Sequence, residues 1–177
     1  IYPNVKLKIE AGVEVRFYTG TGLEFRDAQA ELQGSVQEPI HFKLDSEDPS
    51  NISVDDYWSG INFKSSSGAF VDRSLAFLKF EHALAALAFQ NEPGFKYVEH
   101  CDFQNNLTAI SNGSQNFTWL EVNESFFARN RRGIVGRMNI RHSTFISNEI
   151  AVADPLFFQN ENVGGRIENC RFEANQL

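Results

Sequence analysis

The sequence has no excess of positive charge and no long apolar run. Its 16 Lys and Arg residues are outnumbered by 23 Asp and Glu residues, which gives a formal charge of −7. Nucleic acids and anionic membranes attract basic surfaces, so this balance argues against both as general partners. No stretch approaches the ~18 apolar residues of a membrane-spanning helix, and Ile1 begins no signal peptide. We expect no nucleic-acid partner, and we expect any targeting signal to lie outside these residues.

The sequence also has little that is typical of a nucleotide or calcium site. Two glycines occur in Thr19–Gly22, but no helical pattern follows, so we interpret the segment as a turn and not as a phosphate-binding loop. Five acidic residues occur in Asp45–Tyr57 and could supply oxygen ligands to calcium. This segment lacks the spacing and the glycine of an EF-hand loop, and a solvated acidic loop is the alternative. We expect no cofactor.

The main feature of the sequence is a repeat between Leu75 and Asn175. Its five copies begin 23, 24, 18 and 27 residues apart, so a constant unit is joined by segments of variable length. This is the signature of a solenoid. Each copy has Phe five residues after its first residue, and the last four copies have Asn eight residues after it. The copies begin at Leu75, Val98, Val122, Ile140 and Ile167, and the two columns are Phe80, Phe103, Phe127, Phe145 and Phe172, and Asn106, Asn130, Asn148 and Asn175.

The residue types in each unit indicate strands and not helices. β-Branched residues and Phe recur at spacings of two, which is the period of a strand. Identical residues in successive coils are favourable only in a parallel, in-register stack. There the Phe rings stack about 4.8 Å apart along the axis, and the Asn amides hydrogen-bond to one another. We expect the Asn residues to occupy the bends between strands in the left-handed (αL) conformation.

We therefore predict an all-β protein, a parallel β-helix (solenoid) of about seven coils. We expect one domain over residues 1–177, with opening coils at 1–63 and regular Phe/Asn repeats at 75–177. Exposed terminal coils are unpaired strand edges, so we expect the chain to be a fragment of a larger protein whose flanking domains cap the coil ends. The segment Ala83–Phe89 is apolar enough for a short helix, but the repeat places it in a bend and a strand.

The repeat Val/Ile-x-x-Cys/Ser-x-Phe-x-x-Asn-x-x-Ala/Gly-Ile/Val resembles that of the right-handed, pectate-lyase-like superfamily. The segments Leu7–Phe17, Gly22–Phe25 and Trp58–Phe63 are similar to its opening coils. The resemblance implies a right-handed parallel β-helix but no single function, because this architecture hosts lyases, hydrolases, epimerases, adhesins and inert spacers. The chain resembles more weakly the extracellular β-helix regions of the Bark beetle (Anakonda) family of tricellular-junction proteins.

The only two cysteines occupy the same position of the repeat, three coils apart. Cys101 and Cys170 should therefore lie roughly 14 Å from each other along the axis. A disulfide requires Cα atoms about 4.4–6.8 Å apart. We predict two buried free thiols that behave as small apolar side chains.

Five triplets match the acceptor pattern for N-glycosylation, more than this composition would give by chance. Asn106 belongs to the inward column, so we expect no glycan there. We expect Asn112 and Asn116 on a loop between coils, and Asn123 pointing outward from a strand. Together with Asn51, these three residues are the candidate glycosylation sites. The excess of acceptor triplets favours an extracellular or cell-surface location.

Two groups of outward residues could carry chemistry. His100, Glu124 and His142 should be neighbours in successive coils, where they could bind zinc, perform acid–base catalysis or form a plain polar ladder. The arginines of the second group could receive an anionic polysaccharide or an acidic protein, or could form a solvated bend. This candidate anion or partner patch consists of Arg129, Arg131, Arg132 and Arg137, with Arg141 nearby.

The residues typical of catalysis are scarce. Polysaccharide-cleaving members of the superfamily that the chain resembles use clustered aspartates on successive coils, or a calcium-bound carboxylate set with Arg or Lys. We find no pair of aspartates in adjacent coils of one outward column, and no Gly-His-Gly or Arg-Ile-Lys motif. We predict a non-catalytic extracellular structural or interaction module, a rigid rod whose loops contact a protein partner. One alternative is a β-helix that binds or processes carbohydrate, through the arginine patch or the face that contains Trp119. Another is a bacterial surface adhesin, in which the acceptor triplets would be accidental.

Overall fold

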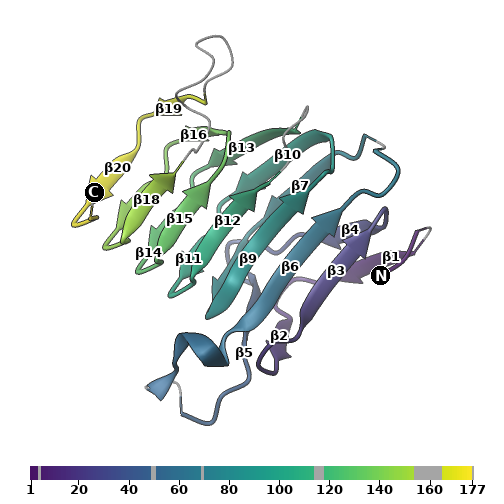
Figure 1. Ribbon diagram of the computed structural model, residues 1–177, viewed down its shortest axis with the longest axis horizontal. Coiled ribbons are helices and arrows are strands. Elements are labelled where there is room, and N and C mark those ends of the chain that lie inside the picture. The colour runs from purple at the N-terminus through teal and green to yellow at the C-terminus, as the bar shows by residue number, and fades with distance from the viewer. Residues whose placement is uncertain (4, 49–50, 69, 114–117, 154–164, 177) are drawn as a thin grey trace.

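The computed structural model shows a parallel β-solenoid and describes residues 1–3, 5–48, 51–68, 70–113, 118–153 and 165–176 (Figure 1). Apart from one strand pair in the first two coils, its strands form three stacks that run along the solenoid. The third to sixth coils each contribute one strand to each stack, and this strand pairs in parallel with its counterparts in neighbouring coils. The described chain makes six complete coils and the first two strands of a seventh. This confirms the predicted fold and is close to the predicted number of coils.

We number the three stacks in the order in which each coil enters them. Sheet 1 contains β7 (Arg73–Ala76), β10 (Gly94–Glu99), β13 (Thr118–Asn123), β16 (Asn139–Arg141) and β19 (Ile167–Glu168). Sheet 2 contains β2 (Glu14–Phe17), β5 (Ile40–Leu44), β8 (Leu78–Glu81), β11 (Asp102–Gln104), β14 (Phe126–Ala128), β17 (Thr144–Ile146) and β20 (Arg171–Glu173). Sheet 3 contains β3 (Gly22–Arg26), β6 (Trp58–Lys64), β9 (Ala83–Gln90), β12 (Thr108–Asn112), β15 (Arg132–Val135) and β18 (Ile150–Ala153).

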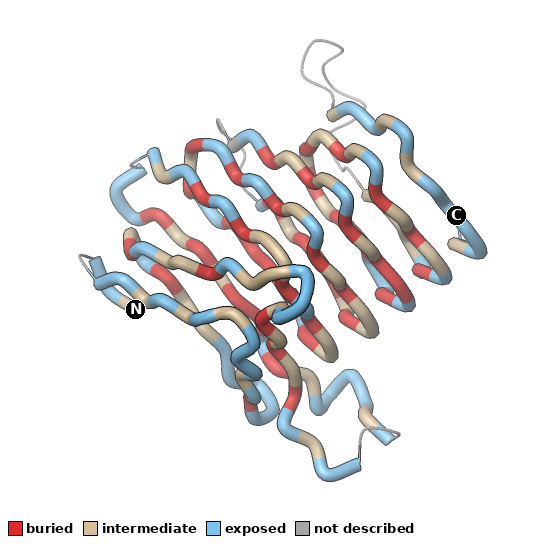
Figure 2. The backbone as a smooth tube through the Cα atoms, turned by 180° about the vertical axis from the view of Figure 1, so that it is seen from behind, coloured by how far each residue is buried: buried red, intermediate tan, exposed pale blue. Residues whose placement is uncertain are grey.

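The first two coils begin with their own strand pair. Strands β1 (Lys6–Ile9) and β4 (Gln29–Leu32) pair in parallel, and a bridge between Gln33 and Ala76 continues this pair toward sheet 1. The segment Ala83–Phe89 lies within β9, so the strand expected from the repeat is confirmed over the helix that its composition suggests. Buried and exposed residues alternate along the coils (Figure 2), as expected for strands with one face against the core.

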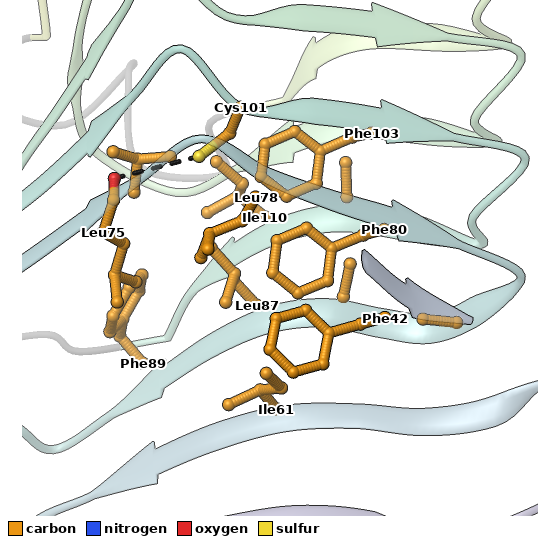
Figure 3. Close-up of a cluster of buried hydrophobic side chains, with 14 of the residues drawn as sticks. Phe42, Ile61, Leu75, Leu78, Phe80, Leu87, Phe89, Cys101, Phe103 and Ile110 are labelled. Carbon is orange, nitrogen blue, oxygen red and sulfur yellow. Dashed lines mark hydrogen bonds between the residues drawn. The ribbon is translucent and has the colours of Figure 1, made fainter. Parts of the chain in front are cut away.

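The predicted Phe column runs through the core from coil to coil. Phe80, Phe103 and Phe127 are paired in register on sheet 2 and stack with ring centroids 5.1 and 4.9 Å apart. The column continues through Phe145 to Phe172, which is 46% exposed because the described chain places no further coil on it. It also extends one coil upstream to Phe42, 5.1 Å from Phe80 (Figure 3). Such stacking stabilises the core in addition to the burial of each ring's apolar area.

A second aromatic column lies on sheet 3. Phe25, Phe63 and Phe89 stack at centroid distances of 5.0 and 5.4 Å, and all three are fully buried. Trp58 joins the core in the same coils, because its ring stacks on Phe17 at 4.3 Å and its Nε1 donates to a backbone carbonyl.

The Asn column forms the predicted hydrogen-bonded ladder. The Nδ2 of Asn106 donates to Oδ1 of Asn130, the Nδ2 of Asn130 to Asn148, and the Nδ2 of Asn148 to Asn175, each at 3.0 Å. The backbone N–H of each donating Asn bonds to the same oxygen of the next coil. Each Nδ2 also reaches back to a Phe carbonyl of the preceding coil, so a single amide connects three coils.

We expected the left-handed bends to lie at the Asn residues, and this prediction was wrong by one residue. The residue before each Asn has a positive φ, for example 56° at Asn105 and 52° at Arg129. The Asn itself begins the turn into sheet 3, because its side chain must point inward to reach the next coil. A second column of positive-φ residues separates sheets 1 and 2 and consists of Phe77, His100, Glu124, His142 and Asn169.

Cys101 and Cys170 are free, as predicted. Cys101 is buried, which raises the pKa of its thiol to about 12, and its Sγ donates to the carbonyl of Glu99. Cys170 is only half-buried, so the prediction of a second fully buried thiol was wrong. The two equivalent serines between them, Ser125 and Ser143, donate to the carbonyl two residues earlier in the same way.

A fully buried ionic cluster lies on the inner side of sheet 1. Arg73 pairs with Glu92 through two hydrogen bonds of 2.7 and 2.5 Å, and Lys96 lies 3.3 Å from the same carboxylate. Lys96 also donates to the carbonyls of Val71 and Pro93. Burial lowers the pKa of Lys96, and the Glu92 carboxylate opposes that shift. The residues of this cluster lie outside the repeated columns, so the repeat pattern gives no indication of it.

Candidate ligand-binding faces

The arginine patch divides into two parts. Arg129 and Arg131 lie at the corner between sheets 2 and 3, beside a surface hollow of about 440 Å³. Arg129 donates to Gln104 and Asn105, and Arg131 lies 3.2 Å from Glu149. Both cations are thus already partnered within the chain.

The other two arginines lie on sheet 3. Arg132 is the exposed first residue of β15, whereas Arg137 follows the far end of that strand, about 16 Å along the chain direction. The backbone carbonyl of Arg137 accepts a hydrogen bond from the side chain of Asn112. The four arginines therefore lie on different parts of the coil surface, and their joint binding of an anion or a partner stays a prediction.

The candidate glycosylation sites differ in exposure. Asn51 is exposed, and Asn123 is half-buried on the outer side of β13. Asn112 was expected on a loop, but it is the last residue of β12, is 7% exposed and donates its amide to a backbone carbonyl. That expectation was wrong because β12 is longer than the repeat unit implied. Asn106 is buried in the ladder as predicted, and Asn116 lies outside the described residues.

The His–Glu–His column lies along the corner between sheets 1 and 2, beside a surface hollow of about 510 Å³. His100 Nδ1 lies 3.4 Å from Glu124 Oε2. His142 does not join them, because its ring nitrogens contact Asn123 and Asn169 at 3.2 and 3.3 Å. These are contacts of a cross-strand polar ladder. Within the ranges described above, no group of three or more His, Cys, Asp or Glu residues is arranged to hold a metal ion.

Two carboxylates from adjacent coils lie on the outer face of sheet 2. Asp102 pairs in register with Lys79 and Gln104 with Glu81, so the carboxylates of Asp102 and Glu81 are diagonal neighbours. Burial raises the pKa of Asp102, and the charge of Glu81 adds to that shift. His41, at 3.4 Å, lowers the pKa of Glu81. We searched the sequence down single columns for aspartate pairs, so this diagonal pair was missed.

The outer face of sheet 1 carries three exposed aromatic side chains. Phe95 and Tyr97 alternate on β10 with inward residues, and their rings are nearly parallel at a centroid distance of 6.3 Å. Trp119 of β13 lies directly opposite Phe95 in the strand register. Phe95, Tyr97 and Trp119 are 45%, 38% and 52% exposed. We call these three residues the aromatic platform. Only Trp119 was predicted as part of a binding face, because the repeat unit begins after Phe95 and Tyr97.

A polar groove of about 250 Å³ continues the aromatic platform along the same sheet. Glu121 lies opposite Tyr97 in the register, and Glu99 lies opposite Asn123. Arg141 contacts Glu168 at 3.0 Å and Glu121 at 3.9 Å, which leaves the carboxylates of the groove in excess over its cations. The face thus combines flat apolar surface with hydrogen-bonding groups and a negative potential.

Comparisons with protein-family models, with curated proteins and with solved structures found no match. What is established is therefore the parallel β-solenoid itself. In the described part of the chain no helix is long and apolar enough to cross a membrane.

Proposed function

We propose that the chain is a non-catalytic interaction module of an extracellular or cell-surface protein. In this role it is a rigid β-helix rod whose outer faces contact a protein partner or an extracellular glycan. The observation that carries the proposal is the continuity of the Phe and Asn columns, which hold successive coils in fixed register. Rigid elements present binding groups at fixed spacing and lose little conformational entropy when a partner binds.

Three features support the extracellular and adhesive part of the proposal. The repeat resembles that of the pectate-lyase-like superfamily, which includes adhesins and spacers, and more weakly that of the Bark beetle family of junction proteins. The acceptor triplets at Asn51 and Asn123 are accessible enough for modification. Three exposed aromatic residues on one sheet are more apolar surface than a bare spacer requires.

Carbohydrate processing is the second candidate function, and the carboxylate pair Glu81 and Asp102 favours it. Two neighbouring carboxyl groups whose pKa values are shifted in opposite directions suit the roles of base and acid. Against this role, Glu81 is engaged by His41, and Gln104 donates two hydrogen bonds to Asp102. These contacts are those of a polar network on the outer face of a sheet.

A paired binding and turnover assay tests the proposal. Beads coated with the chain are added to cultured animal cells, and the soluble chain is incubated with polygalacturonate, xylan and chitin oligosaccharides. We expect the beads to bind to the cell surface and no polysaccharide to be cleaved. Release of reducing ends by the wild-type chain, lost in Asp102→Asn, would establish the catalytic alternative. Beads that bind no better than albumin-coated beads would overturn the interaction role.

A further inference from the structure

The aromatic platform is exposed in a way that folding alone does not explain. Its three side chains point away from the core, whereas the inward neighbours Val98 and Leu120 are buried. The same strands carry polar residues at their other outward positions, including Glu121 and Asn123. Contiguous aromatic surface bordered by polar residues on a soluble protein marks a binding site.

The platform is held rigidly from behind. Lys96, which lies between Phe95 and Tyr97 on β10, points inward and is fixed by Glu92. The backbone N–H of Phe95 donates to the carboxylate of Asp72 at 2.8 Å. The backbone of β10 that carries Phe95 and Tyr97 is therefore held in place before any ligand arrives, which reduces the entropic cost of binding.

The chemistry of this face matches a saccharide. A sugar ring has flat patches of C–H groups that stack on aromatic rings, and its hydroxyl groups donate hydrogen bonds to carboxylates and amides. The platform supplies the rings, and Glu99, Glu121 and Asn123 supply the acceptors in the adjoining groove. The groove runs across parallel strands about 4.8 Å apart, and Glu121 and Asn139 lie opposite each other on two of them, so acceptors occur on adjacent strands.

The charge of the face excludes acidic saccharides. Arg141 is already paired with Glu168, and three carboxylates, those of Glu99, Glu121 and Glu124, line the groove. The chain as a whole has a formal charge of −7. A polyuronate or a sulfated glycan would be repelled at this face, whereas hydroxyl and amino groups would find acceptors.

A protein partner fits the face less well. A stable protein interface covers about 800 Å² on each partner and has an apolar centre depleted of charge. The platform is only three side chains wide and borders directly on Glu121 and Glu99, so a protein covering it would bury two carboxylates, and Arg141, which contacts Glu121 at 3.9 Å, is already paired with Glu168. A narrow ligand that stacks on the rings and donates hydrogen bonds to the carboxylates avoids that cost.

We infer, on the basis of the proposed interaction role, that the aromatic platform and its groove on sheet 1 bind an oligosaccharide that carries no acidic groups. Phe95, Tyr97 and Trp119 stack on the sugar rings. Glu99, Glu121 and Asn123 accept hydrogen bonds from the sugar hydroxyls or amines.

The inference is tested by calorimetric titration of the unglycosylated chain with cello-, manno-, xylo- and chito-oligosaccharides, with oligogalacturonate as the acidic comparison. We expect at least one of the four neutral or amino-sugar series to bind and oligogalacturonate not to bind. Trp119→Ala and Tyr97→Ala should each weaken binding by about tenfold, the loss expected for one stacking contact. Tyr18→Ala, which removes an exposed aromatic ring elsewhere, is the matched control and should leave affinity unchanged.

The outcomes separate this inference from the proposed function. Binding of oligogalacturonate alone, equal affinity of wild type and Trp119→Ala, or no binding in any of the five series would overturn the saccharide site. Cell binding that persists after the cells are treated with glycosidases, and that Trp119→Ala weakens, would mean that a protein occupies the platform. In that case the interaction role would stand without the saccharide. Correct folding of each variant is checked by its far-UV circular dichroism and thermal midpoint.

Discussion

Asn130 Oδ1 accepts two hydrogen bonds from Asn106, one from its backbone N–H and one from its side-chain Nδ2, each 3.0 Å long. The side-chain Nδ2 of Asn130 in turn donates to the backbone carbonyl of Phe103 in the preceding coil and to Asn148 of the next coil. One buried amide therefore satisfies groups in three successive coils. Loss of this amide would leave buried donors and acceptors without partners.

We expect Asn130→Ala to lower the free energy of unfolding by about 3 kcal/mol, because each unsatisfied buried polar group costs about 1–3 kcal/mol. Asn123→Ala removes an Asn from the adjacent strand, outside the ladder, and should cost less than about 1 kcal/mol. Urea unfolding followed by circular dichroism measures both. Equal losses in the two variants would mean that the ladder contributes no special stability.

The columns of the regular coils could be predicted because a parallel stack rewards the same residue at the same position. Phe103 and Asn130 are visible in the sequence for that reason, and their register and hydrogen bonds were confirmed. The αL bends were misplaced by one residue because side-chain identity is repeated at Asn, whereas the bend residues Asn105 and Arg129 share only their backbone conformation.

The outer faces were harder to predict than the core. Diagonal neighbours such as Glu81 and Asp102 belong to two different columns of the repeat, so comparing residues within one column does not bring them together. The platform residues Phe95 and Tyr97 precede the repeated unit, and segments of variable length hide their register. The buried pair Arg73 and Glu92 contradicts the usual exposure of charged residues, so composition gave no signal for it.

The buried ionic cluster has two cations and one carboxylate, so its members should differ in their effect on stability. Glu92→Gln would leave Arg73 and Lys96 buried without a counter-charge, and we expect a loss of about 3–5 kcal/mol. Lys96→Met leaves the paired Arg73 and Glu92 intact and replaces a desolvated ammonium with an apolar side chain of similar length. We expect Lys96→Met to cost clearly less than Glu92→Gln in the same urea titration. A reversed order would contradict the assignment of Glu92 as the charge that holds the cluster together.

The stability of the protein should depend on pH through Asp102. Burial raises the pKa of this carboxyl group in the folded state. The folded protein therefore holds the proton more tightly than the unfolded chain. The contribution of Asp102 to stability is fully present below the unfolded pKa and is lost as pH rises through the higher folded pKa.

We accordingly expect Asp102→Asn to be more stable than wild type at neutral pH. The difference in stability between the two proteins should shrink as the pH falls through the range in which Asp102 of the wild type becomes protonated. Thermal midpoints measured at several values of pH provide the comparison. A stabilisation by Asp102→Asn that is the same at every pH would contradict the raised pKa.

The acceptor triplets should differ in occupancy when the chain is secreted from a glycosylating host. Asn106 and Asn112 donate their side-chain amides to buried acceptors, so a glycan on either would prevent the final packing of its coil. We expect intact-glycopeptide mass spectrometry to find Asn51 and Asn123 modified and Asn106 and Asn112 unmodified. A glycan on Asn106 in folded, secreted protein would contradict the inward ladder.

A glycan on Asn123 should also control access to the outer face of sheet 1. Asn123 lies between Glu99 and Arg141 in the strand register and lines the polar groove. A branched glycan attached there would cover the groove that adjoins Tyr97 and Trp119. We expect the glycosylated chain to bind neutral oligosaccharides more weakly than the unglycosylated chain, and Asn123→Gln to restore most of the affinity. Asn51→Gln removes a glycan from the exposed segment between β5 and β6 and should restore nothing, because that segment does not contribute to the groove.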